Sequence, residues 1–357
     1  MDIRWSVPVY RSPASGKCPR RQKLTHYSKP GFPTATIGID LGGTRYKIGW
    51  QVAGGGLTDT VTLSTGSHRK VDVVLAEVAE AVSAMVERAH LARESIVAVG
   101  IGVPAVIDPA VGRIILLPNF SESWQGFLLT DALSALIGLP VYLINDARSF
   151  TLAEARLGAG RGTANLLGVT LGTGVGGGLV LDGKLRFGPN HMAGEFGHIS
   201  IDPHGLRCGC GGLGCIESYA SGPAIAATAL RPLLQGRAPM LRELIGGDLN
   251  ELDADAVAAA AREGEAECRE IFERVGHAVG LGIAHVMKIA DIERVIVGGG
   301  VAEAGEMLFG PIRETVRANT AVFGPVQPQI AAASIEQPGA TGAALWARER
   351  FSEEHRA

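Results

Sequence analysis

Residues 35–44 read A-T-I-G-I-D-L-G-G-T, and residues 165–178 read N-L-L-G-V-T-L-G-T-G-V-G-G-G. In both stretches an apolar run leads into a turn of glycine and threonine, and strand-forming residues follow the turn. Each stretch therefore predicts a strand, a tight turn and a returning strand. Because the same unit occurs twice, the sequence indicates an internal duplication.

Both units are followed by further helices and strands. Apolar residues at helical spacing predict helices over residues 71–92 and 128–137, and nearly continuous apolar runs at 96–103 and 141–144 predict strands buried on both faces. After the second unit the chain is mainly helical, with one more buried strand at 294–297. We therefore expect an α/β protein in which two duplicated domains face each other across a cleft.

The expected domains cover residues 35–145 and 146–339, and a final helix within residues 340–357 is expected to complete the first domain. Residues 1–34 are rich in Pro, Ser and basic residues without hydrophobic periodicity, which predicts a disordered basic tail. The tail lacks the apolar stretch of a secretory signal, and no run in the chain approaches the ~18 apolar residues of a membrane span. These features predict a cytoplasmic protein with no membrane partner.

The composition limits the possible partners further. Of the 357 residues, 46% are hydrophobic and 19% are charged, which is typical of a globular protein with a substantial core. The net charge is −3 although residues 1–30 are strongly basic, so the rest of the chain is acidic. An acidic surface disfavours a phosphate backbone, and we expect no nucleic-acid partner.

Residues 194–218 read G-E-F-G-H-I-S-I-D-P-H-G-L-R-C-G-C-G-G-L-G-C-I-E-S and contain three of the five cysteines. Three thiolates and one imidazole form a closed tetrahedral set for structural zinc. The cysteines have the spacing C-x-C-x4-C, and a histidine lies ten residues before the first of them, so the expected ligands are His198, Cys208, Cys210 and Cys215. His204 is an alternative fourth ligand that the spacing does not exclude. A disulfide framework is not expected, because five cysteines are few for a chain of this length and an odd number cannot all pair.

Two carboxylates flank this loop, Glu195 and Glu217, and neither is needed to complete the metal site. A structural metal that holds acidic side chains in place indicates a site for a polar ligand such as a sugar.

Glycine-rich turns are candidate phosphate sites, because they expose backbone N–H groups without an obstructing side chain. None of them is a Walker loop or a dinucleotide-binding fingerprint, since the required lysine or long helix does not follow. A single glycine turn can be only a turn, but two copies in duplicated positions favour phosphate binding. The candidate residues are Gly42, Gly43, Thr44, Gly172, Thr173, Gly174, Gly298, Gly299 and Gly300.

Three further polar residues follow predicted strands or lie in an irregular loop. Asp146 follows the strand at 141–144 and is the candidate general base, although it or Asn145 can instead cap the helix expected over residues 147–157. Asp40 can anchor Mg²⁺ or cap its own turn. Asn119 can bind a sugar hydroxyl or serve only its turn.

Together these motifs resemble the ROK family (repressors, open reading frames, kinases) of the sugar-kinase/actin/Hsp70 superfamily. The matching segments cover most of the chain beyond the tail. They are I-D-L-G-G-T (39–44), I-N-D-A (144–147), L-G-T-G-V-G-G-G (171–178), A-G-E-F-G-H (193–198), C-G-C-G-G-L-G-C-I-E (208–217) and V-G-G-G-V (297–301).

The resemblance implies two ribonuclease-H-like (actin-like ATPase) domains and an ATP-dependent, glucokinase-like sugar kinase that uses Mg²⁺. It implies that Asp146 deprotonates the primary hydroxyl of the sugar, which attacks the γ-phosphoryl group of ATP. The turns at 42–44 and 172–174 would hold phosphates, and residues 298–300 would lie near the adenosine. The implied sugar-binding residues are Asn119, Asn145, Asp146, Glu195, His198 and Glu217, with His198 shared between zinc and sugar.

Several alternatives stay open within the family. Glucose is the expected substrate, but kinases for N-acetylmannosamine, N-acetylglucosamine and fructose share these motifs, and the phosphoryl donor can be ATP or polyphosphate. A homodimer is the family expectation. The second hypothesis is a sugar-sensing repressor, but only 34 residues precede the first strand, fewer than the ~60 that we expect a winged helix-turn-helix to need.

Overall fold

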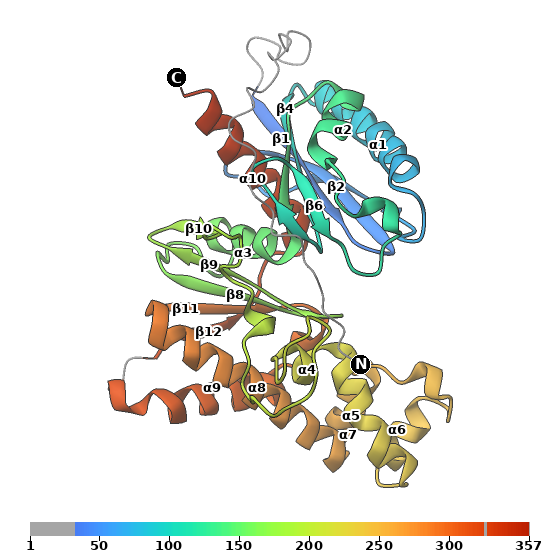
Figure 1. The fold of residues 1–357 in the computed structure, drawn as a ribbon, viewed down its shortest axis with the longest axis vertical. Helices are drawn as coiled ribbons and strands as arrows, with labels where there is room; N and C mark the ends of the chain where they lie inside the picture. Colours follow the sequence, from blue (N-terminus) through green and yellow to red (C-terminus); the bar gives the residue numbers. More distant parts are fainter. Residues whose placement is uncertain (1–32, 325–326, 357) are drawn as a thin grey trace, which may run out of the picture.

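The computed structural model of the chain describes residues 33–324 and 327–356. The tail predicted over residues 1–34 lies outside the described residues, except for its last two positions. In the described ranges, no helix combines the length and the apolar character that a membrane crossing requires. The structure has two halves, and each is built around a five-stranded sheet (Figure 1).

The first sheet has the strand order β3-β2-β1-β4-β7. The first three strands form an antiparallel meander, β4 is parallel to β1, and β7 is parallel to β4. β1 and β4 are buried along nearly their whole length, as their apolar sequences predict. The bounds are β1 (Thr34–Leu41), β2 (Arg45–Val52), β3 (Thr58–Ser64), β4 (Ser95–Val103) and β7 (Val141–Asn145).

The second sheet has the order β10-β9-β8-β11-β12 and repeats the first one strand for strand. It again consists of an antiparallel meander, followed by β11 parallel to β8 and β12 parallel to β11. The duplication predicted from the two glycine turns is therefore confirmed. The bounds are β8 (Leu166–Leu171), β9 (Val175–Leu181), β10 (Lys184–Arg186), β11 (Arg294–Gly298) and β12 (Gln329–Ala332).

Helices cover both sheets and connect the halves. α1 (Val71–Leu91) and α2 (Leu129–Ile137) pack on one face of the first sheet, and α10 (Pro338–Glu354) packs on the other. α3 (Asp146–Arg156) lies between α10 and the strands β8 and β9. The remaining helices belong to the second half and are α4 (Glu217–Ala220), α5 (Gly222–Leu234), α6 (Pro239–Leu244), α7 (Ala254–Glu263), α8 (Ala266–Ala290) and α9 (Glu306–Thr320).

The position of α10 depends on two glycines of the first sheet. A methyl group on Gly38 would lie 1.9 Å from the carbonyl oxygen of Ala340, and one on Gly100 would lie 1.8 Å from that of Ala343. Only glycine therefore allows the helix backbone to rest directly on β1 and β4. This contact brings the last helix of the chain onto the first sheet.

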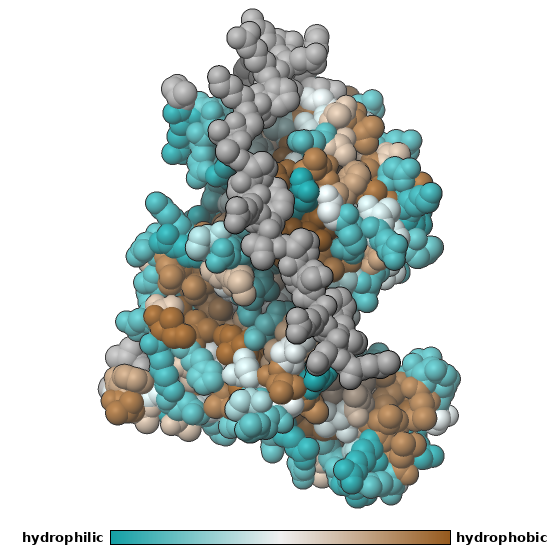
Figure 2. Space-filling model, in the orientation of Figure 1, coloured by the Kyte–Doolittle hydropathy of each residue, from teal (hydrophilic) through white to brown (hydrophobic). Residues whose placement is uncertain are grey.

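The surface combines hydrophilic residues with hydrophobic patches. In Figure 2 one such patch lies at the lower right, over the region of α5 and α6. Leu234, Met240 and Leu244 of these two helices are exposed. The patch lies at the end of the second half that is farthest from α10 (Figure 1).

Candidate active site and metal centre

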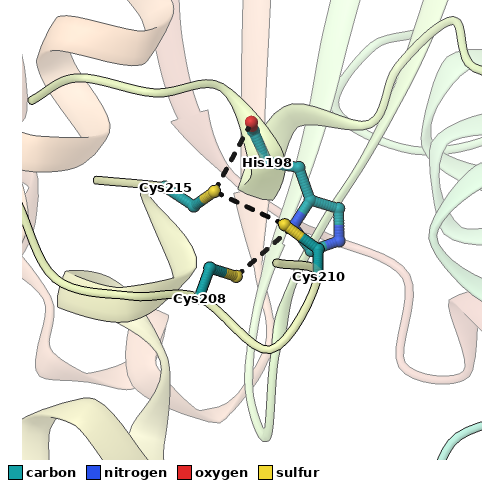
Figure 3. Close-up of side chains that lie close together, drawn as sticks. All are labelled: His198, Cys208, Cys210 and Cys215. Carbon is teal, nitrogen blue, oxygen red and sulfur yellow. Dashed lines mark hydrogen bonds between the residues drawn. The ribbon is translucent and has the colours of Figure 1, made fainter. Parts of the chain in front are cut away.

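The predicted metal ligands converge at one point. Figure 3 shows the three sulfur atoms and the imidazole of His198 pointing toward one another. The Cys210 and Cys215 sulfurs are 3.7 Å apart, and the Cys208 sulfur is 3.8 Å from Nδ1 of His198. All four ligand atoms lie within 4.8 Å of one another, and His204 is not in this group.

Local backbone contacts shape the loop that carries the cysteines. The segment pairs with itself at two isolated bridges, Ser200 with Cys215 and Arg207 with Leu213. The N–H of Cys208 also donates to the carbonyl of Gly212. Gly214 has a φ of +65°, and a methyl group there would lie 1.8 Å from the carbonyl oxygen of Asp202. The glycines therefore let the chain reverse tightly enough to bring the sulfurs together.

The donor set fits zinc. Ligands at the ~2.3 Å Zn–S and ~2.0 Å Zn–N distances of a tetrahedral site lie about 3.5–3.8 Å from one another. The measured separations of 3.7 and 3.8 Å match this range. The ring of His198 directs Nδ1 to the sulfurs, so Nε2 faces away from them and is available to another ligand.

Glu217 connects the cysteine-bearing loop within residues 194–218, here called the metal loop, to the second glycine turn, residues 172–174. Its Oε1 lies 3.7 Å from the Cys208 sulfur, and its Oε2 accepts a hydrogen bond from the N–H of Val175 at 3.0 Å. A methyl group on Gly174 would lie only 2.7 Å from the same Oε2. The carboxylate therefore contacts both motifs.

The two glycine turns close equivalent hairpins. The N–H of Gly42 donates to Arg45 between β1 and β2, and the N–H of Gly172 donates to Gly174 between β8 and β9. Gly299, at the end of β11, has a φ of +91°, and a methyl group there would lie 2.2 Å from the carbonyl oxygen of Leu171. Residues 298–300 are thus adjacent to the second turn, at the carboxyl ends of two parallel strands.

The sequence left open whether Asn145 or Asp146 caps the helix that follows them, and in the structure Asn145 is the cap. The side chain of Asn145 caps α3 by accepting a hydrogen bond from the N–H of Arg148, and its amide donates to the carbonyl of Ala105. Asp146 accepts from the N–H of Ala147. Burial, and after it the nearby carboxylate of Asp40, raise the pKa of Asp146 to about 7.

Asp40 lies at the end of β1 and contacts the start of α10. A methyl group on Gly339 would lie 2.4 Å from its carboxylate. Burial raises the pKa of Asp40, and the charge of Lys47 partly opposes this shift. Two neighbouring, partly buried carboxylates, Asp40 and Asp146, are a donor set that fits Mg²⁺, because a hard divalent cation prefers oxygen ligands and would offset their repulsion.

Asn119 has a left-handed backbone, with a φ of +63°. Asn tolerates this conformation better than most residues, so the turn role is fulfilled. The loop is joined to the first glycine turn, since Ser121 N–H donates to Ser67 and Ser67 N–H donates to Gly43. Asn119 is exposed, and its contact with a sugar stays a prediction.

Arg148 is a residue of the site that the sequence analysis did not identify. Its side chain is only 2% exposed, and one of its guanidinium nitrogens lies 3.0 Å from Oε1 of Glu195. The available signal was a single charged residue within A-R-S-F-T-L-A (147–153), a stretch of α3 that is otherwise apolar or small. Such a residue must find partners when it is buried.

Comparison with known proteins agrees with this architecture. The chain is 36% identical to the glucokinase of Thermotoga maritima over 316 residues, which is 88% of this chain and 98% of that protein. It is 33% identical to an N-acetylmannosamine kinase of Escherichia coli O157:H7 over 271 residues, covering 75% and 84% of the two chains. The crystal structure of a ROK family glucokinase from Streptomyces griseus in complex with glucose and AMPPNP has a TM-score of 0.76 and 34% identity, covering 88% of this chain and 99% of that one.

A family model extends this similarity through both halves. The model described as the ROK family matches residues 36–350, which include both sheets, the glycine turns and the cysteine loop. The chain therefore belongs to the ROK family.

Proposed function

We propose that this protein is an ATP-dependent kinase that phosphorylates glucose at its primary hydroxyl. The observation that carries the proposal is the position of Asp146, at the carboxyl end of β7, where burial and then the nearby carboxylates of Asp40 and Glu195 raise its pKa. The relatives named above support a sugar kinase, and the two glucokinases among them support glucose.

Asp146 is suited to act as the general base. A pKa of about 7 leaves a substantial fraction of the carboxylate deprotonated at neutral pH, and this value is high enough to accept a proton from a hydroxyl in the transition state. Asn145 caps α3, and the hydrogen bond from the N–H of Ala147 engages Oδ1 of Asp146, so Oδ2 would accept the proton of the substrate.

The glycine turns would hold the phosphates of ATP with their backbone N–H groups. When bound, Mg²⁺ would neutralise charge on the transferred phosphoryl group, and Asp40 is the residue that would hold it. Phosphoryl transfer depends mainly on positioning and charge neutralisation, which this arrangement of turns and carboxylates provides.

The sugar would be held by residues around the metal loop. His198 would present Nε2 to a hydroxyl, and the carboxylates of Glu195 and Glu217 would accept hydrogen bonds from others. When bound, zinc would fix the orientation of the His198 ring. Asn145 would contribute less than the sequence suggests, because its oxygen and amide already have partners in the chain.

The proposal is tested across glucose, fructose, N-acetylglucosamine and N-acetylmannosamine by ADP release with ATP as the donor, and ATP and polyphosphate are compared by the sugar phosphate that each one forms. We expect the highest kcat/KM for glucose with ATP. A higher value for N-acetylmannosamine would replace glucose by the substrate of the Escherichia coli relative. Absence of phosphorylation together with sugar-dependent DNA binding would favour a repressor instead.

A further inference from the structure

Arg148 donates to one short segment of chain only a few residues long. Its Nη2 lies 2.6 Å from the carbonyl oxygen of His191, 3.1 Å from that of Ala193 and 3.0 Å from Oε1 of Glu195, and its Nε lies 3.4 Å from the Ala193 oxygen. The guanidinium also lies over the ring of Phe187, 5.4 Å from its centroid. All four partners fall within residues 187–195, the segment between β10 and the metal loop.

This segment needs an external partner to hold its shape. His191 has a φ of +57° and Gly194 a φ of +91°, so its backbone is irregular. Two of its carbonyl groups point to Arg148 rather than to a backbone N–H. Nη2 and Nε of one rigid guanidinium plane reach these two carbonyl oxygens together, whereas the single ammonium nitrogen of a lysine cannot place two donors in this fixed arrangement.

We propose that Arg148 is a positioning residue, which holds the segment 187–195 against α3 and thereby fixes Glu195 for one hydroxyl of the sugar. The proposal rests on the proposed function. It assigns a role to a residue two positions after Asp146, on the same helix, so that the general base and the residue that orients a sugar ligand are carried by one rigid element. Arg148 itself acts through Glu195 and does not need to touch the sugar.

The test compares Arg148→Lys with Glu195→Gln and with the double variant. For each protein, kcat/KM is measured for glucose and for a set of deoxyglucoses that each lack one hydroxyl. In the wild type, removing the hydroxyl that Glu195 binds should lower kcat/KM relative to glucose. This ratio of kcat/KM values should be reduced in Glu195→Gln. In Arg148→Lys it should be reduced about 5–20-fold for that same hydroxyl, since each good hydrogen bond contributes roughly 1–2 kcal/mol. In the double variant the second substitution should add less than about twofold.

Arg156→Lys is the matched control. Arg156 lies on the same helix and likewise contacts a carboxylate and a carbonyl, Glu349 and Gly183, but not the segment 187–195. It should leave the pattern across the deoxyglucoses unchanged. Equal loss for every sugar in Arg148→Lys, with the pattern unchanged, would overturn the proposal, because a merely structural defect would act in this way.

Two further measurements keep the proposal testable if Arg148→Lys does not fold or if no sugar is phosphorylated. Phe187→Leu removes the ring beside the guanidinium and should shift the same pattern in the same direction by a smaller factor; an unchanged pattern would contradict the proposal. If the wild-type protein phosphorylates no sugar, the proposed function fails. Hydrogen exchange then tests only whether Arg148 holds the segment 187–195. The backbone amides within residues 188–195 should exchange at least about tenfold faster in Arg148→Lys than in Arg156→Lys, and equal rates would overturn the proposal.

Discussion

The carboxylate of Glu217 accepts a hydrogen bond from the backbone N–H of Val175, 3.0 Å away, and so joins the cysteine loop to the turn between β8 and β9. The two motifs are about 40 residues apart in sequence and belong to different predicted functions, metal binding and phosphate binding. A second contact reinforces the link, because the N–H of Gly222, the first residue of α5, donates to the carbonyl of Gly172. A change at either motif is therefore expected to affect the other.

Replacing Gly174 by alanine tests this link. The added methyl group would lie 2.7 Å from Oε2 of Glu217, so the carboxylate must move and the hydrogen bond to Val175 is lost. We expect Gly174→Ala to lower the free energy of unfolding by about 1–3 kcal/mol, as measured by urea denaturation. Gly172→Ala is the control for stability, because a methyl group there meets no atom within 4 Å. Equal stability of the two variants would show that the link contributes nothing.

Zinc content tests the metal centre. We expect about one zinc per chain in the purified protein, and chelation should lower the melting temperature, since structural zinc sites contribute on the order of 10 kcal/mol to folding. His198→Ala should lose the metal, whereas His204→Ala should keep it, because only His198 lies beside the sulfurs. A wild-type protein that is free of metal and fully active would contradict the assignment.

The effect of Asp146→Asn on stability should depend on pH. The pKa of Asp146 is raised from 3.8 to about 7, so the folded state holds a proton that the unfolded state releases between about pH 4 and pH 7. The free energy of unfolding of the wild type therefore falls as pH rises through this window. Asparagine removes this cost, and we expect the variant to be more stable than the wild type at pH 8, by on the order of 2 kcal/mol, with little difference near pH 4.

Asn145→Ala should behave in the opposite way. It removes the cap of α3 and should lower the free energy of unfolding by about 0.5–2 kcal/mol at every pH. Thermal unfolding of both variants at pH 4 and pH 8 separates the two roles. A destabilised Asp146→Asn at pH 8 would mean that Asp146 also supports the helix.

Much of the fold could be predicted from the sequence because its signals are local. The apolar run before Gly42 and the one before Gly172 each predict a strand and a turn, and the structure places both in the same sheet position. α9 and β12 are not predicted. α9 contains Gly310 and Pro311, which weaken a helical pattern, and β12 is only the four residues Q-I-A-A.

The cluster of His198 with the three cysteines could likewise be predicted, since cysteine spacing within one loop carries its geometry. Contacts between segments that are far apart in the sequence could not be predicted. Arg148 and Glu154 are both charged and buried in α3, and Glu154 accepts hydrogen bonds from the backbone N–H groups of Ser334 and Ile335, 180 and 181 residues away. A single sequence does not show which remote segment will satisfy such a side chain.

The most direct test of the account is ADP release with glucose and ATP, measured for the wild type and for Asp146→Asn across pH 6 to 9. We expect the wild-type protein to turn over, with kcat/KM falling as pH drops below about 7, because the base must be deprotonated. Asp146→Asn should fold, retain glucose binding and lose roughly 10²–10⁴-fold in kcat. A folded Asp146→Asn variant with the kcat of the wild type would contradict the assignment of the base, and with it the proposed mechanism.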